Sequence, residues 1–270
     1  MLYGIHACLA AIANPEREVR RIVMATQHAD EIEVPVCDAA NTAVDLGGPP
    51  RPSIEFRDRR ELDALVPRDA VHQGICVDVS PLPVPVIEDI IESARGLSSA
   101  CIVVLDQATD PRNIGAVMRT AAAFGALALV VQDKHAPDIT GSMAKAASGA
   151  VERLPLVRAT NLARVLGLLK DAEFWCVGFD GHATDYLSAK TLHGRNAIVL
   201  GAEGARAFFG AVAEEGLALR RVRGDGPRIN VVAGHMPGDA DMIGQANLTP
   251  MINSVDQLIG HVEAVPGHPF

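Results

Sequence analysis

The sequence has few of the residues that would place it in a disulfide-rich, metal-binding or membrane class. Its five cysteines are scattered over 270 residues and form no C-x-x-C pair, which argues against a disulfide framework and a zinc site. No apolar run is long enough to span a bilayer, and no early stretch has the pattern of a secretion signal. We therefore expect a cytoplasmic protein with reduced, mostly buried thiols, no metal and no membrane partner.

Basic residues are also few: the chain has 24 lysines and arginines against 33 aspartates and glutamates. The formal net charge is −9, whereas proteins that bind nucleic acids usually present a basic surface to the phosphates. Residues 1–100 hold 9 basic and 16 acidic side chains, and residues 101–270 hold 15 and 17. Any phosphate contact is therefore expected in the second part of the chain.

A stretch rich in proline divides the chain. Residues 79–87, VSPLPVPVI, carry prolines at 81, 83 and 85, which exclude a regular helix and remove ladder donors from a strand. We interpret this stretch as an extended linker. The predicted domains are a small α/β domain over residues 1–80, a linker over 81–98 and a larger domain over 99–270.

Both predicted domains alternate helical and strand patterns. Before the linker, a helical pattern at 4–14 precedes strand-like runs at 21–25 and 74–79. After it, the pattern predicts strands at 101–105, 127–131, 174–179 and 197–200, and helices at 113–124, 142–148 and 161–170. This rhythm is typical of an α/β domain with a parallel sheet. Ligands bind at the carboxyl ends of such strands, so the loops 106–113 and 201–204 are the expected functional regions.

The first of these loops leads into an amphipathic helix with the string DPRNIGAVMRTA, residues 110–121. Asn113 and Arg119 are six residues apart, which is about 600° of helical rotation, so their side chains do not share one face. On spacing alone, Asp110 or Asn113 would cap the helix and Arg119 would be a solvated surface residue. The full twelve-residue string, however, is more specific than the spacing of these two residues.

Residues 110–121 resemble the first signature of the SpoU/TrmH methyltransferases, a family of knotted enzymes that use S-adenosylmethionine. Residues 197–204, AIVLGAEG, are similar to the second signature, a buried strand that ends in G-x-E-G. That short motif alone usually marks a tight turn, but it is specific together with the first segment. Residues 145–150, 3–6 and 70–75 also resemble the family, the last two its ribosomal-RNA branch, with a small substrate-binding domain.

The family's third signature has only a partial counterpart. Residues 228–234, RINVVAG, keep its Asn-Val pair but lack the flanking serines, so they are either a divergent form or a chance match. The resemblance implies a carboxyl-terminal trefoil knot, a homodimer, and 2′-O-methylation of a ribose in RNA. A guanosine of 23S rRNA is the first choice of substrate, and tRNA is the second. A catalytically silent RNA- or ribosome-binding relative is the alternative.

The resemblance also implies a set of site residues. The residues implied in cofactor binding are Leu200, Gly201, Gly204, Val222, Ile229 and Asn230. Arg119, Asn113 and Glu203 are implied in catalysis, although Glu203 is equally well explained as a structural carboxylate that stabilises its loop. A different α/β enzyme that holds a nucleotide is a weaker alternative, because neither G-x-G-x-x-G nor a P-loop occurs.

Overall fold

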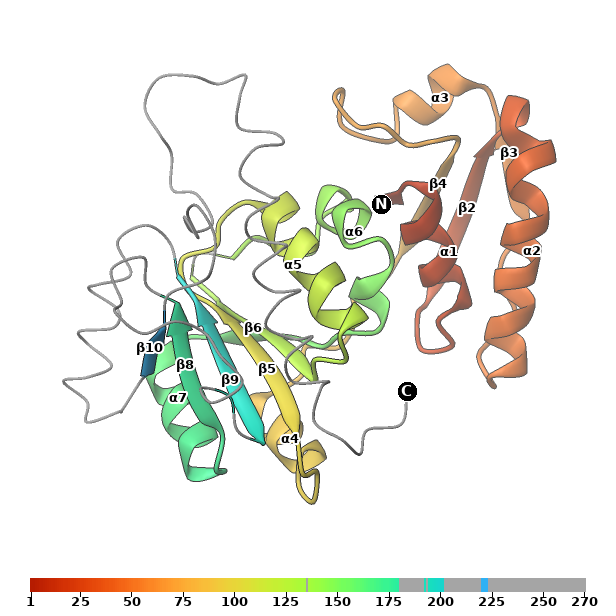
Figure 1. Cartoon of the computed structure of the whole chain (residues 1–270). Helices are drawn as coiled ribbons and strands as arrows, with labels where there is room; N and C mark the ends of the chain where they lie inside the picture. The colour runs from red at the N-terminus through yellow and green to blue at the C-terminus, as the bar shows by residue number, and fades with distance from the viewer. Residues whose placement is uncertain (135, 180–191, 193, 202–219, 223–270) are drawn as a thin grey trace, which may run out of the picture. The chain divides into compact units, whose positions relative to one another are not determined.

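The computed structural model describes residues 1–134, 136–179, 192, 194–201 and 220–222 (Figure 1). The chain forms two compact units. The first contains residues 1–83 and also 138–153, and the second contains residues 84–137, apart from residue 135, and the described residues from 154 onward. No helix among the described residues has both the length and the apolar character needed to cross a membrane.

The first unit is an α/β structure around a mixed four-stranded sheet in the order β1-β4-β2-β3. Its strands are Leu2–Tyr3 (β1), Val19–Ala25 (β2), Ile54–Arg57 (β3) and Ile75–Val79 (β4). Its helices are Ile5–Ala13 (α1), Ala29–Asp45 (α2), Arg59–Asp63 (α3) and Gly141–Ala147 (α6), with short 3-10 turns at Thr26–His28 and Ala150–Glu152. Apolar side chains of α1 and α2 pack against β2 and β4 and form its main core.

A buried ion pair ties residues 138–153 into the first unit. Arg17 donates to both carboxylate oxygens of Glu152, at 2.6 and 3.0 Å, and both side chains are only 3% exposed. Asn14 donates to the same carboxylate at 2.9 Å, and the remaining Arg17 nitrogen donates to the carbonyl of Ser80 at 2.6 Å. Every charged atom of the pair therefore has a partner, as a pair removed from water requires.

The second unit contains a six-stranded sheet in the order β10-β8-β9-β5-β6-β7, in which every neighbouring pair is parallel. Its strands are Ala100–Leu105 (β5), Ala128–Gln132 (β6), Leu156–Ala159 (β7), Trp175–Phe179 (β8), Arg195–Leu200 (β9) and Arg220–Val222 (β10). Its helices are Ile87–Ser93 (α4), Pro111–Ala123 (α5) and Leu162–Asp171 (α7).

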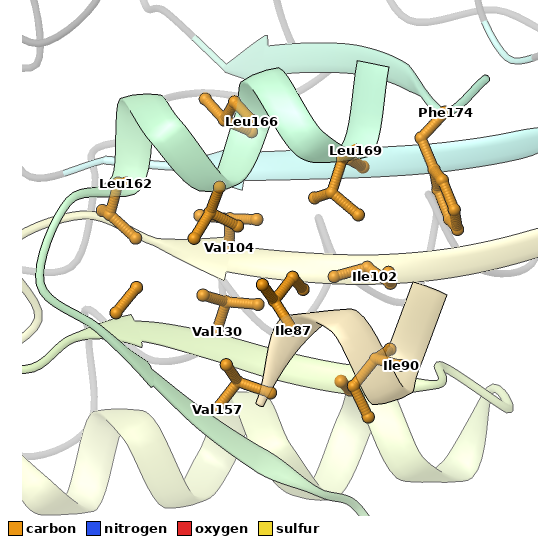
Figure 2. Packing of buried hydrophobic residues seen from close by; sticks show 14 of the residues in the cluster. Ile87, Ile90, Ile102, Val104, Val130, Val157, Leu162, Leu166, Leu169 and Phe174 are labelled. Atoms are coloured by element: carbon orange, nitrogen blue, oxygen red, sulfur yellow. The ribbon is translucent and has the colours of Figure 1, made fainter. Parts of the chain in front are cut away.

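Helices α4 and α7 cover one face of this sheet. Figure 2 shows Ile87 and Ile90 of α4, with Leu166 and Leu169 of α7, packed against Val104 and its neighbours. Alternate side chains of a strand point to opposite faces, and those of β5 are buried on both. Burial on both faces is what a near-continuous apolar strand in a parallel sheet requires.

The structure confirms the parallel α/β sheet and places a strand or helix at each range predicted after the proline-rich stretch, although the helix predicted at 142–148 is α6 of the first unit. The stretch 81–98 differs from a simple linker, because Ile87–Ser93 forms α4. Its three prolines all lie before Ile87, so they leave the later residues free to form a helix, and Ile87 and Ile90 give that helix a buried face. The boundaries 1–80, 81–98 and 99–270 stay a prediction.

The thiols are free, as predicted, and Cys37 is the exposed one of the five. Burial raises the pKa of Cys101 to about 12 and that of Cys176 to about 11. Burial also raises the pKa of Cys76 to about 11. The thiolate is the reactive form, so these three side chains are packing residues and not nucleophiles.

Glu152→Ala leaves the guanidinium of Arg17 buried without its carboxylate. We expect the free energy of unfolding to fall by roughly 3–5 kcal/mol, measured by urea unfolding followed by circular dichroism. Glu92→Ala is the matched control, because its ion pair with Arg95 is exposed, and we expect a loss below about 1 kcal/mol. Equal losses in the two variants would contradict a structural role for the Arg17–Glu152 pair.

Candidate active site

The carboxyl ends of β5 and β9 lie side by side. In the register of this pair Leu105 is opposite Leu200, and the amide of Asp106 continues the ladder by donating to the carbonyl of Leu200 at 2.9 Å. Asp106 and Gly201 are therefore the first residues beyond the two strands. Both are buried, and Asp106 is only 3% exposed.

This pair of strands is also where the connectivity of the sheet changes direction. From β5 the chain continues through β6 to β7 on one side, whereas β9, β8 and β10 lie on the other side of β5. In open parallel sheets a ligand binds beyond the carboxyl ends at such a switch point. The loop 106–113 begins here, and so does Gly201, the first residue of the other loop predicted to be functional.

Helix α5 begins immediately after the β5 loop. Asp110 is its N-cap and accepts from the amide of Arg112 at 2.8 Å, and Pro111 occupies the first turn, where a missing amide hydrogen costs nothing. Asn113 therefore lies in the first turn, beside the carboxyl edge of the sheet, and is half-buried. The cap thus fixes the start of the helix that carries both Asn113 and Arg119.

Arg119 projects from the surface of α5. Its neighbours Met118 and Thr120 are buried, whereas Arg119 is exposed. It lies about 9 Å further along the helix axis than Asn113, at a rise of about 1.5 Å per residue. The helix thus presents a half-buried amide near the strand ends and an exposed cation farther along.

The other predicted site residues divide into those the structure describes and those it does not. Leu200 closes β9 and is buried, and Gly201 follows it. Val222 closes β10, where its backbone is opposite Phe179 of β8, so its strand also ends at the carboxyl edge. Glu203, Gly204, Ile229 and Asn230 lie outside the described residues. No cluster of three or more possible metal ligands occurs among the described residues.

The sequence pattern did not identify a clamp that Arg158 forms beside this edge. Arg158 of β7 donates to the carboxylate of Asp133 at 2.7 Å and to the carbonyls of Ala136 and Pro137 at 2.7 and 3.0 Å. These contacts fix the loop after β6, next to the β5 loop. A half-buried arginine in an otherwise apolar strand was the available signal.

Comparison with known proteins gives the family of the chain. The sequence model of the SpoU rRNA methylase family matches residues 100–206, and that of the RNA 2′-O ribose methyltransferase substrate-binding domain matches residues 1–85. The 23S rRNA (guanosine-2′-O-)-methyltransferase RlmB of Pseudomonas syringae pv. tomato is 37% identical over 206 residues, which cover 75% of this chain and 78% of the relative. The chain belongs to the SpoU rRNA methylase family.

Further relatives agree with this assignment. RlmB of Escherichia coli K12 is 32% identical to the SpoU chain over 204 residues, which cover 76% of the chain and 81% of the relative. Among solved structures, the SpoU methyltransferase AviRb of Streptomyces viridochromogenes, in complex with AdoMet, aligns with a TM-score of 0.64 at 17% identity. This alignment covers 99% of the SpoU chain and 91% of AviRb, and it shows a shared fold.

Asp110→Ala removes the N-cap of α5 in this SpoU chain. The amide of Arg112 then loses its acceptor, so we expect the free energy of unfolding to fall by about 1 kcal/mol. Asp110→Asn is the matched control, because asparagine is an equally good cap, and we expect it to unfold at nearly the same urea concentration as the unaltered protein. An equal loss for alanine and asparagine would argue against the cap.

Proposed function

We propose that this chain transfers a methyl group from S-adenosylmethionine to a ribose 2′-hydroxyl of RNA, most specifically to a guanosine of 23S rRNA. The observation that carries this proposal is the 37% identity to an enzyme of that name over most of both chains. The placement of the two signature segments supports it, because residues 110–121 and the end of β9 lie beside the same strand ends. The catalytically silent relative is disfavoured, since the curated relatives are named as enzymes.

The finer architecture is part of the same proposal. We assign RNA substrate binding to the small domain over residues 1–80, a connecting role to 81–98 and methyl transfer to 99–270, with a trefoil knot in the carboxyl-terminal part. The match of the substrate-binding model to residues 1–85 supports the first assignment. A homodimer in the cytoplasm is the proposed working form, with rRNA as the first substrate choice and tRNA as the second.

We propose that the cofactor binds beyond β9. Gly201, the first residue after β9, is buried. Because it has no side chain, the backbone can approach a ligand closely there. The apolar ends Leu105 and Leu200 suit the adenosine part of such a molecule, and the first residue beyond β5, Asp106, is a buried carboxylate. The described residues therefore fit the group. Leu200, Gly204, Val222, Ile229 and Asn230 complete the proposed cofactor set.

When bound, S-adenosylmethionine supplies an electrophilic methyl group on a sulfonium. The protein must then orient the ribose hydroxyl and help its proton to leave. An arginine is almost always protonated, so we assign electrostatic activation of the hydroxyl to Arg119, together with a substrate phosphate. Asn113 can donate and accept, so it orients Arg119 or a ribose oxygen, and Glu203 is assigned to accept from either.

A methylation assay with the purified full-length protein tests the function. Unmodified 23S rRNA and tRNA transcripts are incubated separately with S-adenosylmethionine carrying a labelled methyl group, and the modified nucleoside is identified by mass spectrometry. We expect 2′-O-methylguanosine in the 23S transcript. Label in tRNA alone would change the substrate, and cofactor binding without transfer to either RNA would favour the silent relative.

Arg119→Ala removes the cation assigned to the hydroxyl. We expect the rate of methyl transfer to fall by about two orders of magnitude or more, with the affinity for S-adenosylmethionine nearly unchanged, because loss of a charge that stabilises a transition state typically costs that much. Arg164→Ala is the matched control, since Arg164 is an exposed arginine on α7 of the same unit. Turnover of Arg119→Ala equal to that of the control would exclude the assigned role.

Gly201→Val adds a branched side chain at the buried end of β9. The new methyl groups occupy space assigned to the cofactor, so we expect the loss of measurable S-adenosylmethionine binding in isothermal titration calorimetry. Circular dichroism provides the folding control. A folded Gly201→Val protein that binds the cofactor with unchanged affinity would place the cofactor elsewhere.

A further inference from the structure

Four residues other than glycine adopt a left-handed backbone in the part of the chain that the structure describes. Their φ angles are 57° for Gln73, 54° for Gln107, 50° for Ser148 and 63° for Glu173. A residue with a Cβ is strained in this conformation, because the Cβ crowds the following carbonyl oxygen. Such strain persists only where the surroundings fix it, and it is concentrated at functional sites.

Three of the four have a structural reason for this conformation. Gln73 accepts a hydrogen bond from the amide of Ile5, at the start of α1, at 3.4 Å. Ser148 is the C-cap of α6, where helices commonly end in a left-handed residue. Glu173 follows the C-cap of α7, and its carboxylate accepts from Arg195 at 2.6 Å.

Gln107 lies at no helix end and has no side-chain hydrogen bond to a described residue that would explain its left-handed backbone. It follows a strand and not a helix, its side chain is exposed, and its amide forms no hydrogen bond with any residue that the structure describes. Glycine occupies seven other left-handed positions among the described residues and would fit here without strain. Gln107 therefore keeps a side chain that forms no hydrogen bond within the described fold.

The position of Gln107 connects this side chain to the site. Asp106 still pairs with Leu200 of β9, so Gln107 is the first residue of the β5 loop beyond the ladder, at the switch point of the sheet. The same loop leads into α5, which carries Asn113 and Arg119. An exposed amide thus lies where the proposed function requires the RNA to approach.

We propose that Gln107 contacts the substrate, with its side-chain amide hydrogen-bonded to the base edge of the target nucleotide. This inference rests on the proposed function. The amide carries a donor and an acceptor next to each other, which matches the adjacent donor and acceptor atoms on the edge of an unstacked base. It carries no charge, so it suits a base better than a phosphate, which arginine and lysine bind.

The central variant is Gln107→Gly, which removes the amide and also the backbone strain. We expect its melting temperature to equal or exceed that of the unaltered protein. We also expect its Kd for an unmodified 23S rRNA transcript, and its KM for that RNA, to rise by about 2- to 10-fold, the value of one net hydrogen bond. Affinity for S-adenosylmethionine stays unchanged. A merely structural role for Gln107 would not give weaker RNA binding without a loss of stability.

Two further variants sharpen the comparison. Gln107→Asn keeps a shorter amide and tolerates the left-handed backbone, so we expect RNA affinity between those of glutamine and glycine. Glu173→Gly is the matched control, because it relieves the same kind of strain at the amino end of β8, and we expect unchanged RNA affinity.

The outcomes separate this inference from the proposed function. If the unaltered protein methylates 23S rRNA while Gln107→Gly keeps its Kd and KM for RNA, the inference fails and the function stands. A selective loss of S-adenosylmethionine affinity in Gln107→Gly would make Gln107 a cofactor contact and would also overturn the inference. If the unaltered protein transfers no methyl group to RNA, the proposed function itself fails, and the inference fails with it.

Discussion

The parallel pairing of β5 with β9 is the constraint on which the candidate site depends. It places Leu105 next to Leu200, although about 95 residues separate them in the sequence. Strand β5 and residues 197–200 of β9 are apolar and buried, so the pairing is stabilised by packing as well as by the ladder. Because the strands run in the same direction, both following loops leave the sheet at one edge. The start of residues 110–121 and the described part of residues 197–204 therefore lie beside the same edge of the sheet, where we propose the site.

Arg119, the cation assigned to the reaction, contributes little to the packing of the helix that carries it. Helix α5 illustrates this division: Ile114, Val117 and Met118 are buried, while Arg119 is exposed, and Asp110 fixes where the helix begins. Loss of the arginine should therefore affect the reaction far more than the stability of the fold. In the first unit, the buried Arg17–Glu152 pair has the opposite character, because it uses charge for structure and holds residues 138–153 within that unit.

Much of the second unit could be predicted from the sequence, for identifiable reasons. Short β-rich runs such as 101–105 and 197–200, separated by helical patterns, predict a parallel sheet, and the rule that ligands bind at carboxyl ends indicates the two loops. Helix α4 was not predicted, because the prolines before it dominate the pattern. The strand order, the Arg158 clamp and the left-handed backbone of Gln107 depend on contacts between residues distant in the sequence, so local periodicity carries no signal for them.

We propose that the edge formed by β5 and β9 holds the methyl donor. Hydrogen–deuterium exchange of the full-length protein, with and without saturating S-adenosylmethionine, tests this claim directly because it locates the binding. We predict slower exchange in peptides that span residues 105–113 and 198–204, and no change at the opposite end of the sheet, in the α7–β8 turn around Glu173. Saturable binding that protects other segments and leaves these two unchanged would contradict the account.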